Sequence, residues 1–123
     1  MPTILIADDT PSEAALMASV VKQLGYTASL VSDGEACLAT AKTLKPDLIL
    51  LDVVMPKLDG FNTCRKLKKD PDLAKTPVIM VTSKNQDSDR FWAEKQGANR
   101  FVAKPFTPET LTEAIQALLP KAG

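Results

Sequence analysis

The sequence contains no histidine. Histidine is the most common general base and metal ligand in proteins, so its absence leaves carboxylates, hydroxyls and lysine to carry any chemistry. The two cysteines, Cys37 and Cys64, lie far apart without C-x-x-C spacing, which argues against a zinc site. We expect both to be small buried residues on helices.

A net charge and long apolar runs are also absent. Fifteen Lys and Arg residues balance fifteen Asp and Glu residues, so no positive field would hold the protein on nucleic acid or an acidic membrane. No apolar run approaches the roughly 20 residues that span a bilayer, and no basic segment precedes the N-terminal apolar residues. We therefore expect a cytoplasmic protein with no nucleic-acid partner and no membrane insertion, and we expect it to be a monomer.

Five short apolar segments alternate with five segments that have helical features. The chain has 123 residues, which fits a single domain over residues 1–123 and leaves no room for a separate output module. The alternation predicts an α/β fold with a parallel sheet and helices on both faces. The predicted strands are Thr3–Ala7, Tyr26–Val31, Leu48–Leu51, Val78–Val81 and Phe101–Ala103.

The central strand and the helix starts have the clearest local signals. Leu48–Leu51 has no polar alternation, as expected of a strand buried on both faces. The segment T-P-S-E predicts a capping box, with Thr10 as N-cap and Glu13 three residues later. The cap-and-proline pattern recurs at Thr107-Pro108 and predicts the start of the last helix.

Four predicted strands end in a reactive side chain: Asp8-Asp9, Asp52, Thr82 and Lys104. Parallel strands share one carboxyl edge, where open α/β sheets bind ligands, so these residues should meet. Carboxylates held close together repel unless a cation compensates, and an all-oxygen site suits Mg²⁺, or Mn²⁺ as a substitute. A metal, an ammonium and a hydroxyl around one carboxylate would stabilise a phosphoryl group in transit, so Asp52 is predicted to form an acyl phosphate.

Each of these residues also has a structural explanation. Asp8 and Asp9 could stabilise a helix N-terminus through its dipole. Thr82 could be a turn residue at a strand end, and Lys104 a surface lysine. Thr10 already fills the capping role, and the joint placement of all these groups at strand ends favours a functional site.

At these residues the sequence resembles the response-regulator receiver domains of two-component and chemotaxis systems, over essentially its whole length. The resemblance implies a flavodoxin-like fold of five β/α units with strand order 2-1-3-4-5. It implies phosphoryl transfer from a histidine kinase, of the type used in chemotaxis, to Asp52. It also implies that Asp9, Asp52 and the backbone carbonyl of Val54 hold Mg²⁺, with Asp8 acting through water.

The resemblance also indicates which residues would respond to the phosphoryl group on Asp52 and act as a conformational switch. Lys104 would pair with that group, Thr82 would close onto it, and the Lys104–Pro105 peptide bond would be cis. The switch aromatic is Phe101, which can rotate inward but cannot hydrogen-bond.

Two positions that tune hydrolysis in the family are Val54 and Lys84, two residues after the acceptor aspartate and the switch threonine. Val54 should hold the attacking water poorly and give a long-lived phosphoaspartate.

The segment D-R-F-W-A-E-K-Q-G-A resembles the single-domain receivers of type IV pilus and twitching-motility chemosensory systems. Successive helical residues point about 100° apart, so Phe91, Trp92 and Ala93 cannot all face the core. Trp92 either lies at the rim of its helix, where an exposed aromatic suits partner docking, or folds back over a neighbouring loop.

The sequence therefore predicts a stand-alone phosphoacceptor switch whose output is binding, with only self-catalysed phosphoryl acceptance and slow autodephosphorylation. The downstream target is left open, and a phosphate sink for the kinase is an alternative. Aspartate-nucleophile phosphatases or mutases usually carry a second acid two residues after the nucleophile, where this chain has Val54. A nucleotide or flavin module is disfavoured because no G-x-G-x-x-G or Walker loop follows any strand.

Overall fold

The computed structural model describes residues 2–119, in which five strands alternate with five helices. Among these residues, no helix is both long and apolar enough to cross a membrane. The strands are β1 (Thr3–Ala7), β2 (Thr27–Val31), β3 (Leu48–Leu51), β4 (Val78–Thr82) and β5 (Arg100–Ala103). The helices are α1 (Pro11–Gln23), α2 (Gly34–Leu44), α3 (Gly60–Lys69), α4 (Asp87–Lys95) and α5 (Pro108–Leu118).

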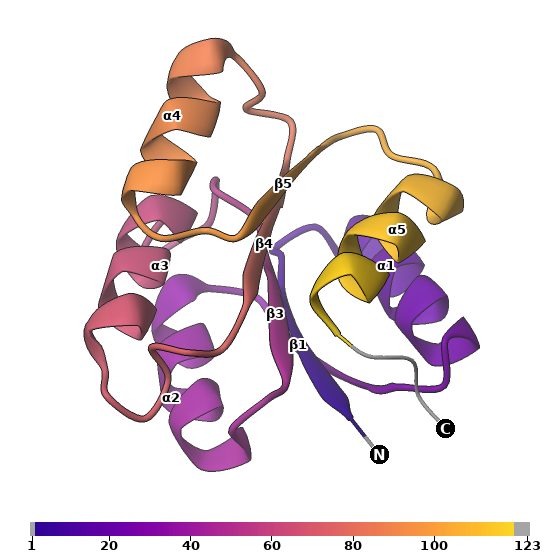
Figure 1. Cartoon of the computed structure of the whole chain (residues 1–123), viewed down its shortest axis with the longest axis horizontal. Coiled ribbons are helices and arrows are strands. Elements are labelled where there is room, and N and C mark those ends of the chain that lie inside the picture. The colour runs from indigo at the N-terminus through magenta and orange to yellow at the C-terminus, as the bar shows by residue number, and fades with distance from the viewer. Residues whose placement is uncertain (1, 120–123) are drawn as a thin grey trace.

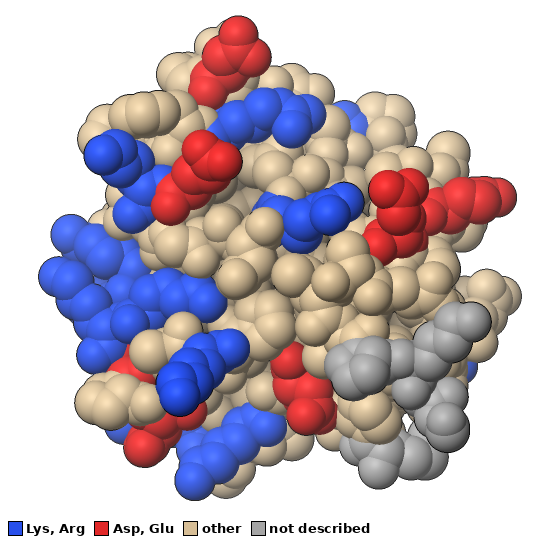
Figure 2. Space-filling view, in the orientation of Figure 1, with Lys and Arg blue, Asp and Glu red and all other residues tan. Residues whose placement is uncertain are grey.

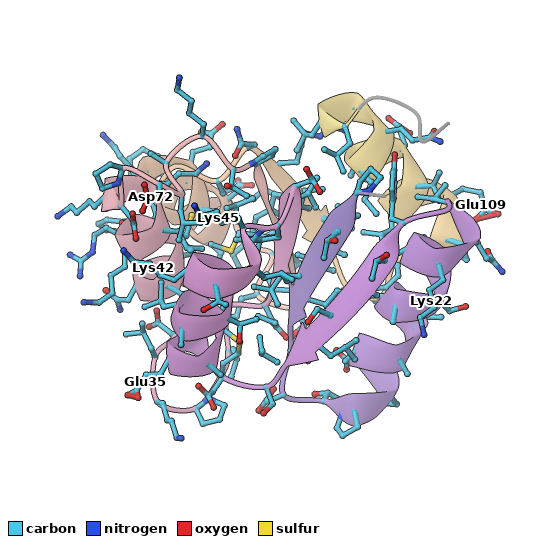
Figure 3. The ribbon with its side chains drawn as sticks, turned by 90° about the horizontal axis from the view of Figure 1, so that it is seen from below. Lys22, Glu35, Lys42, Lys45, Asp72 and Glu109 are labelled. Atoms are coloured by element: carbon cyan, nitrogen blue, oxygen red, sulfur yellow. The ribbon has the colours of Figure 1, made fainter. Side chains whose placement is uncertain are left out.

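All neighbouring strands pair in parallel, in the order β2-β1-β3-β4-β5. The predicted α/β fold and strand order are therefore confirmed. The sheet lies between two layers of helices, with α1 and α5 on one face and α2, α3 and α4 on the other (Figure 1). Seen from below, Lys22 and Glu109 mark the α1 and α5 layer, while Lys42 and Asp72 lie on the opposite side (Figure 3).

Alternate residues of the central strands supply two separate apolar cores. Ile4 and Leu50 pack with residues of α1 and α5, whereas Leu5 and Ile49 pack with residues of α2, α3 and α4. Successive strand side chains point to opposite faces, so an uninterrupted apolar run is what a doubly covered sheet requires. All four residues of β3 are fully buried, as the sequence predicted.

The two cap-and-proline segments behave differently. The Thr107 hydroxyl accepts a hydrogen bond from the Thr110 N–H at 3.1 Å and caps α5. Thr10 occupies the N-cap position of α1, but its side chain makes no cap hydrogen bond. The predicted capping box at α1 is wrong because the Glu13 carboxylate instead accepts a hydrogen bond from Lys104.

Both cysteines are free and fully buried, on α2 and α3, as predicted. The Cys64 thiol donates to the Gln96 carbonyl at 3.3 Å. Burial raises the pKa of Cys37 to about 12 and that of Cys64 to about 11. Neither thiol is therefore a thiolate at neutral pH.

We expect neither cysteine to react with an aromatic disulfide reagent at pH 8 while the protein is folded. The nucleophile is the thiolate, and both groups are buried with raised pKa values. The absorbance of the released thiol measures the reaction, and unfolding in guanidinium should expose both groups. Rapid labelling of the native protein would contradict the structure.

The balanced net charge conceals an uneven distribution. Lys66, Lys68 and Lys69 all lie in the last turn of α3, and Figure 2 shows Lys and Arg side chains gathered on the side of the molecule where α3 lies. Acidic side chains appear on both sides of the same view, so the basic cluster on α3 is a local feature of a chain that is neutral as a whole.

Candidate functional site

The carboxyl ends of β1, β3, β4 and β5 bring the predicted reactive residues to one edge of the sheet. Asp8 directly follows β1, Asp52 follows β3 and Lys104 follows β5, while Thr82 is the last residue of β4. Backbone hydrogen bonds continue past the strands: the Asp52 N–H donates to the Ala7 carbonyl at 3.0 Å, and the Lys104 N–H donates to the Thr82 carbonyl at 3.0 Å. The sheet itself thus fixes where these side chains start.

The Lys104 ammonium lies at the centre of the site. Its Nζ donates to Asp8 Oδ2 at 2.7 Å, to Asp52 Oδ2 at 2.9 Å and to the Glu13 carboxylate. Only 9% of the side chain is exposed. Burial alone would lower the pKa of Lys104, but the hydrogen bonds to the three carboxylates outweigh burial and raise the pKa above its ordinary value. The Lys104–Pro105 peptide bond that follows is cis.

The two buried aspartates are held differently. Burial raises the pKa of Asp8, although hydrogen bonds from Lys104 and from the Thr10 N–H oppose the increase. In Asp52, Oδ1 accepts a hydrogen bond from the Val53 N–H at 2.6 Å, while Oδ2 pairs with the ammonium. The Asp52 carboxylate is therefore oriented from both sides.

Three carboxylates could together hold a divalent cation. Asp8, Glu13 and Asp52 each offer one oxygen, and these oxygens lie within 4.8 Å of one another. Lys104 neutralises only one of the three negative charges, so the site has negative charge to spare for a hard cation with oxygen ligands. The donor set thus fits a divalent metal of this type.

This set of acids differs from the predicted ligand set. Asp9 has an exposed side chain and lies outside the group of three. Val54, whose backbone carbonyl was a predicted ligand, follows Asp52 in the loop and exposes 56% of its surface. Glu13 was missed as a site residue because its position in the T-P-S-E segment matched a capping box. The available signal was its place in the first turn of the helix that directly follows the Asp8-Asp9 pair.

Close packing of α3 holds the loop after Asp52 in place. Gly60 begins α3, and its N–H donates to the Val53 carbonyl at 2.8 Å. A Cβ atom at Gly60 would lie 2.1 Å from the Asp52 carbonyl oxygen and 2.7 Å from the Val53 Cα. Only glycine allows the helix to approach the acceptor loop this closely.

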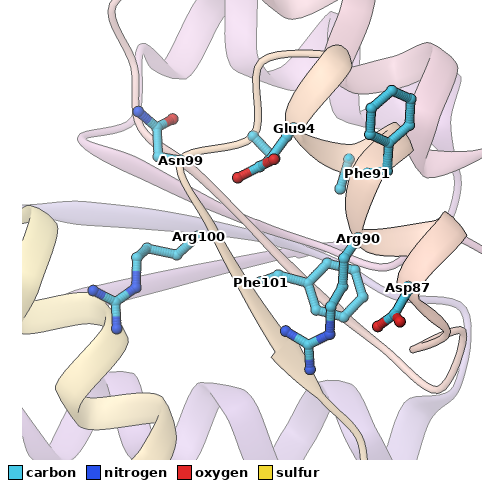
Figure 4. Close-up of a pocket in the computed structure, with 9 residues that line it drawn as sticks. Asp87, Arg90, Phe91, Glu94, Asn99, Arg100 and Phe101 are labelled. Atoms are coloured by element: carbon cyan, nitrogen blue, oxygen red, sulfur yellow. The ribbon is translucent and has the colours of Figure 1, made fainter.

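The predicted switch residues lie between the site and α4. Thr82 is fully buried, and its hydroxyl accepts a hydrogen bond from the Lys84 N–H at 3.2 Å. The Lys84 ammonium lies 3.8 Å from Asp89 in the first turn of α4. Phe101 on β5 is half-buried, and the Arg90 guanidinium carbon lies 4.6 Å from its ring centroid (Figure 4).

The aromatic residues of α4 are at the surface. Trp92 is 53% exposed and contacts Phe91 edge to face with ring centroids 6.0 Å apart, whereas Ala93 is buried. The prediction that the three successive residues cannot all face the core is confirmed. Of the two positions considered for Trp92, its exposure agrees with the rim of the helix.

An open parallel sheet with a lysine-bridged pair of carboxylates at its carboxyl edge defines a receiver module. Comparison with protein families agrees: the model described as "Response regulator receiver domain" matches residues 4–116. The chain belongs to this family of two-component signalling proteins, and the resemblance stated from the sequence is confirmed.

Individual relatives support the same assignment. The chain is 40% identical over 119 residues to protein PilH of Pseudomonas aeruginosa, covering 97% of this chain and 98% of PilH. It spans about half the length of several other curated relatives that it matches. Chemotaxis protein CheY4 of Vibrio cholerae has a TM-score of 0.91 and 29% identity, covering 97% of this chain and 99% of CheY4.

A third relative bears on the metal. The receiver domain of sensor histidine kinase PA1611 from Pseudomonas aeruginosa superposes with a TM-score of 0.88 and 29% identity, covering 95% of this chain and 96% of that domain. Its crystal structure has a magnesium ion coordinated in the active-site cleft.

Proposed function

We propose that Asp52 accepts a phosphoryl group from a histidine kinase and that the chain acts as a switch whose output is protein binding. The observation that carries this proposal is the Lys104 ammonium, which bridges the Asp8 and Asp52 carboxylates at the carboxyl edge of the sheet.

The transfer is a displacement at phosphorus. A carboxylate oxygen of Asp52 forms the new P–O bond while the bond between phosphorus and the kinase histidine nitrogen breaks, and the electron pair leaves with the imidazole. Lys104 neutralises charge on the phosphoryl oxygens. Mg²⁺, with Mn²⁺ as its substitute, would supply further positive charge when held by the acidic side chains. Asp8 and Asp52 belong to the group of acids that could hold it, while Asp9 and the Val54 carbonyl remain ligands proposed from the family resemblance.

The output follows from contacts that exist only after phosphorylation. The Thr82 hydroxyl donates to the phosphoryl group, and Phe101 moves inward as Thr82 shifts, which changes the surface of α4, β5 and α5. A modification shifts a conformational equilibrium only through such differential contacts. Val54 and Lys84, the residues two positions after Asp52 and Thr82, set the rate at which the acyl phosphate is hydrolysed.

The pathway we propose is type IV pilus motility or taxis in the bacterial cytoplasm, with a kinase of the chemotaxis type as phosphodonor. The likeness to PilH supports the pilus connection. Trp92, exposed on α4 beside Phe91, is the proposed docking residue for the downstream protein, because large aromatics dominate binding at interfaces.

The test is incubation with Mg²⁺ and acetyl phosphate, followed by intact mass measurement. The wild-type protein should gain one phosphoryl group and Asp52→Asn should gain none. Asp72→Asn, which removes an exposed carboxylate elsewhere on the surface, is the matched control and should be modified like the wild type. An unmodified wild type, or a phosphoryl group retained by Asp52→Asn, would refute the proposal.

A further inference from the structure

The ammonium of Lys104 has no free hydrogen-bond donor in this structure. An ammonium has three N–H groups, and Asp8, Glu13 and Asp52 each accept one of them. A phosphoryl oxygen that binds Lys104 must therefore displace one of these carboxylates.

The three carboxylates differ in how easily they can leave. The Asp8 side chain is fully buried and also accepts the Thr10 N–H at 2.9 Å, so its release would leave a buried charge without its cation. Asp52 is the acceptor itself and stays beside the new group. The Glu13 side chain is 43% exposed, so water can replace the ammonium as its partner at little cost.

The surroundings of Glu13 give its carboxylate room to move. Glu13 and Lys104 line one open cavity of about 340 Å³, whose wall also includes Leu16, Ser83, Pro105 and Phe106. The carboxylate can thus rotate out of contact with Lys104 into solvent without displacing packed side chains.

We infer that Glu13 is a positioning residue that holds the Lys104 ammonium in the unphosphorylated protein and yields it to the phosphoryl group. This inference rests on the proposed phosphorylation of Asp52. The Glu13 carboxylate acts against phosphorylation because it competes with the phosphoryl oxygens for the Lys104 ammonium. Glu13 therefore opposes phosphorylation of Asp52, whereas the buried aspartates do not.

The alternative role for Glu13 is that of a metal ligand, because its carboxylate belongs to the group of three that could hold a divalent cation. The two roles predict opposite results. A lost metal ligand weakens Mg²⁺ binding and slows phosphorylation at low Mg²⁺. A lost competitor for Lys104 speeds phosphorylation even when Mg²⁺ is saturating.

The test variant is Glu13→Gln, which keeps the size of the side chain and one oxygen acceptor but removes the charge. We expect its rate constant for phosphorylation by acetyl phosphate at saturating Mg²⁺ to exceed that of the wild type about fivefold, as expected for one charge near a partly exposed site. Binding of beryllofluoride, a phosphoryl analogue measured by ¹⁹F NMR, should tighten by a similar factor. Both gains should disappear in a Lys104→Met background.

Glu109→Gln is the matched control, because Glu109 is also exposed in the first turn of a helix and forms no salt bridge among residues 2–119. Its rate should equal that of the wild type. An unchanged or slower Glu13→Gln, a gain that persists without Lys104, or an equal gain in Glu109→Gln would overturn the inference. If the wild type takes up no phosphoryl group at all, the proposed function fails and the inference fails with it.

Discussion

Replacing Lys104 by methionine should destabilise the metal-free protein by about 3 kcal/mol at neutral pH, because breaking a buried ion pair leaves an uncompensated charge. The change removes the only cation that contacts the Asp8, Glu13 and Asp52 carboxylates among the described residues. It should also slow phosphorylation of Asp52 about a hundredfold, which is typical of losing one donor to a developing anion.

The loss of stability should depend on pH. Burial already raises the pKa of Asp8 above 3.8 in the folded protein. A carboxyl with a raised pKa binds more protons when folded than when unfolded, so stability falls as pH rises from about 4 towards the folded pKa. Without Lys104 the pKa rises further, and the fall becomes larger. Lys104 follows the same rule in a higher pH range: because its pKa is also raised, its contribution to stability is complete at neutral pH and is lost only as the pH rises above 10.5.

Urea unfolding at pH 5 and pH 7.5, with and without Mg²⁺, measures these effects. The Lys104→Met variant should recover stability at pH 5 and on addition of Mg²⁺, which binds the folded state. Lys84→Met, which removes a half-exposed lysine near the same edge of the sheet, should differ from the wild type by about 0.5 kcal/mol or less. A Lys104→Met protein that is as stable as the wild type at pH 7.5 without metal would contradict the role of the ammonium.

The residues at the strand ends were predictable from the sequence because each short apolar run is bounded by a polar residue. Asp8, Asp52 and Lys104 each directly follow such a run, and Thr82 ends one. Parallel strands place their ends at one edge whatever the strand order, so the meeting of these residues followed from alternation alone. The strand order did not follow from alternation. Within residues 2–119, β1 lies beside β3, and the sequence indicated this order only through its resemblance to a family.

Contacts that depend on the strand order and the helix layers were beyond the sequence. Glu13 meets Lys104 across 91 residues because α1 and the loop after β5 lie at the same edge of the sheet. A local motif does not predict such a contact. The segments T-P-S-E and T-P-E have the same start, yet the Thr107 side chain caps its helix and the Thr10 side chain does not. The neighbouring acids Asp8 and Asp9 likewise separate into one buried and one exposed side chain, since successive residues leaving a strand point in different directions.

Replacing Gly60 by alanine should destabilise the protein by about 3 kcal/mol, at the upper end for overpacking, and should displace the acceptor loop. The added Cβ would lie 2.1 Å from the Asp52 carbonyl oxygen and 2.8 Å from the Asp52 carbonyl carbon, which are backbone atoms that cannot rotate away. Either α3 or the Asp52–Val53 backbone must therefore move. A displacement of about 1 Å at a reacting group can cost about a hundredfold in rate, so phosphorylation of the folded protein should fall by that order.

Leu67→Ala separates lost stability from a displaced site. Leu67 is a fully buried residue of the same helix and belongs to the core on the α2, α3 and α4 face. Its truncation should cost about 2–5 kcal/mol without a clash against the Asp52 loop. At a temperature where both variants are folded, Leu67→Ala should be phosphorylated at nearly the wild-type rate while Gly60→Ala is not. Equal rates in the two variants would show that Gly60 contributes only to stability, and that the close approach of α3 does not position the acceptor carboxylate.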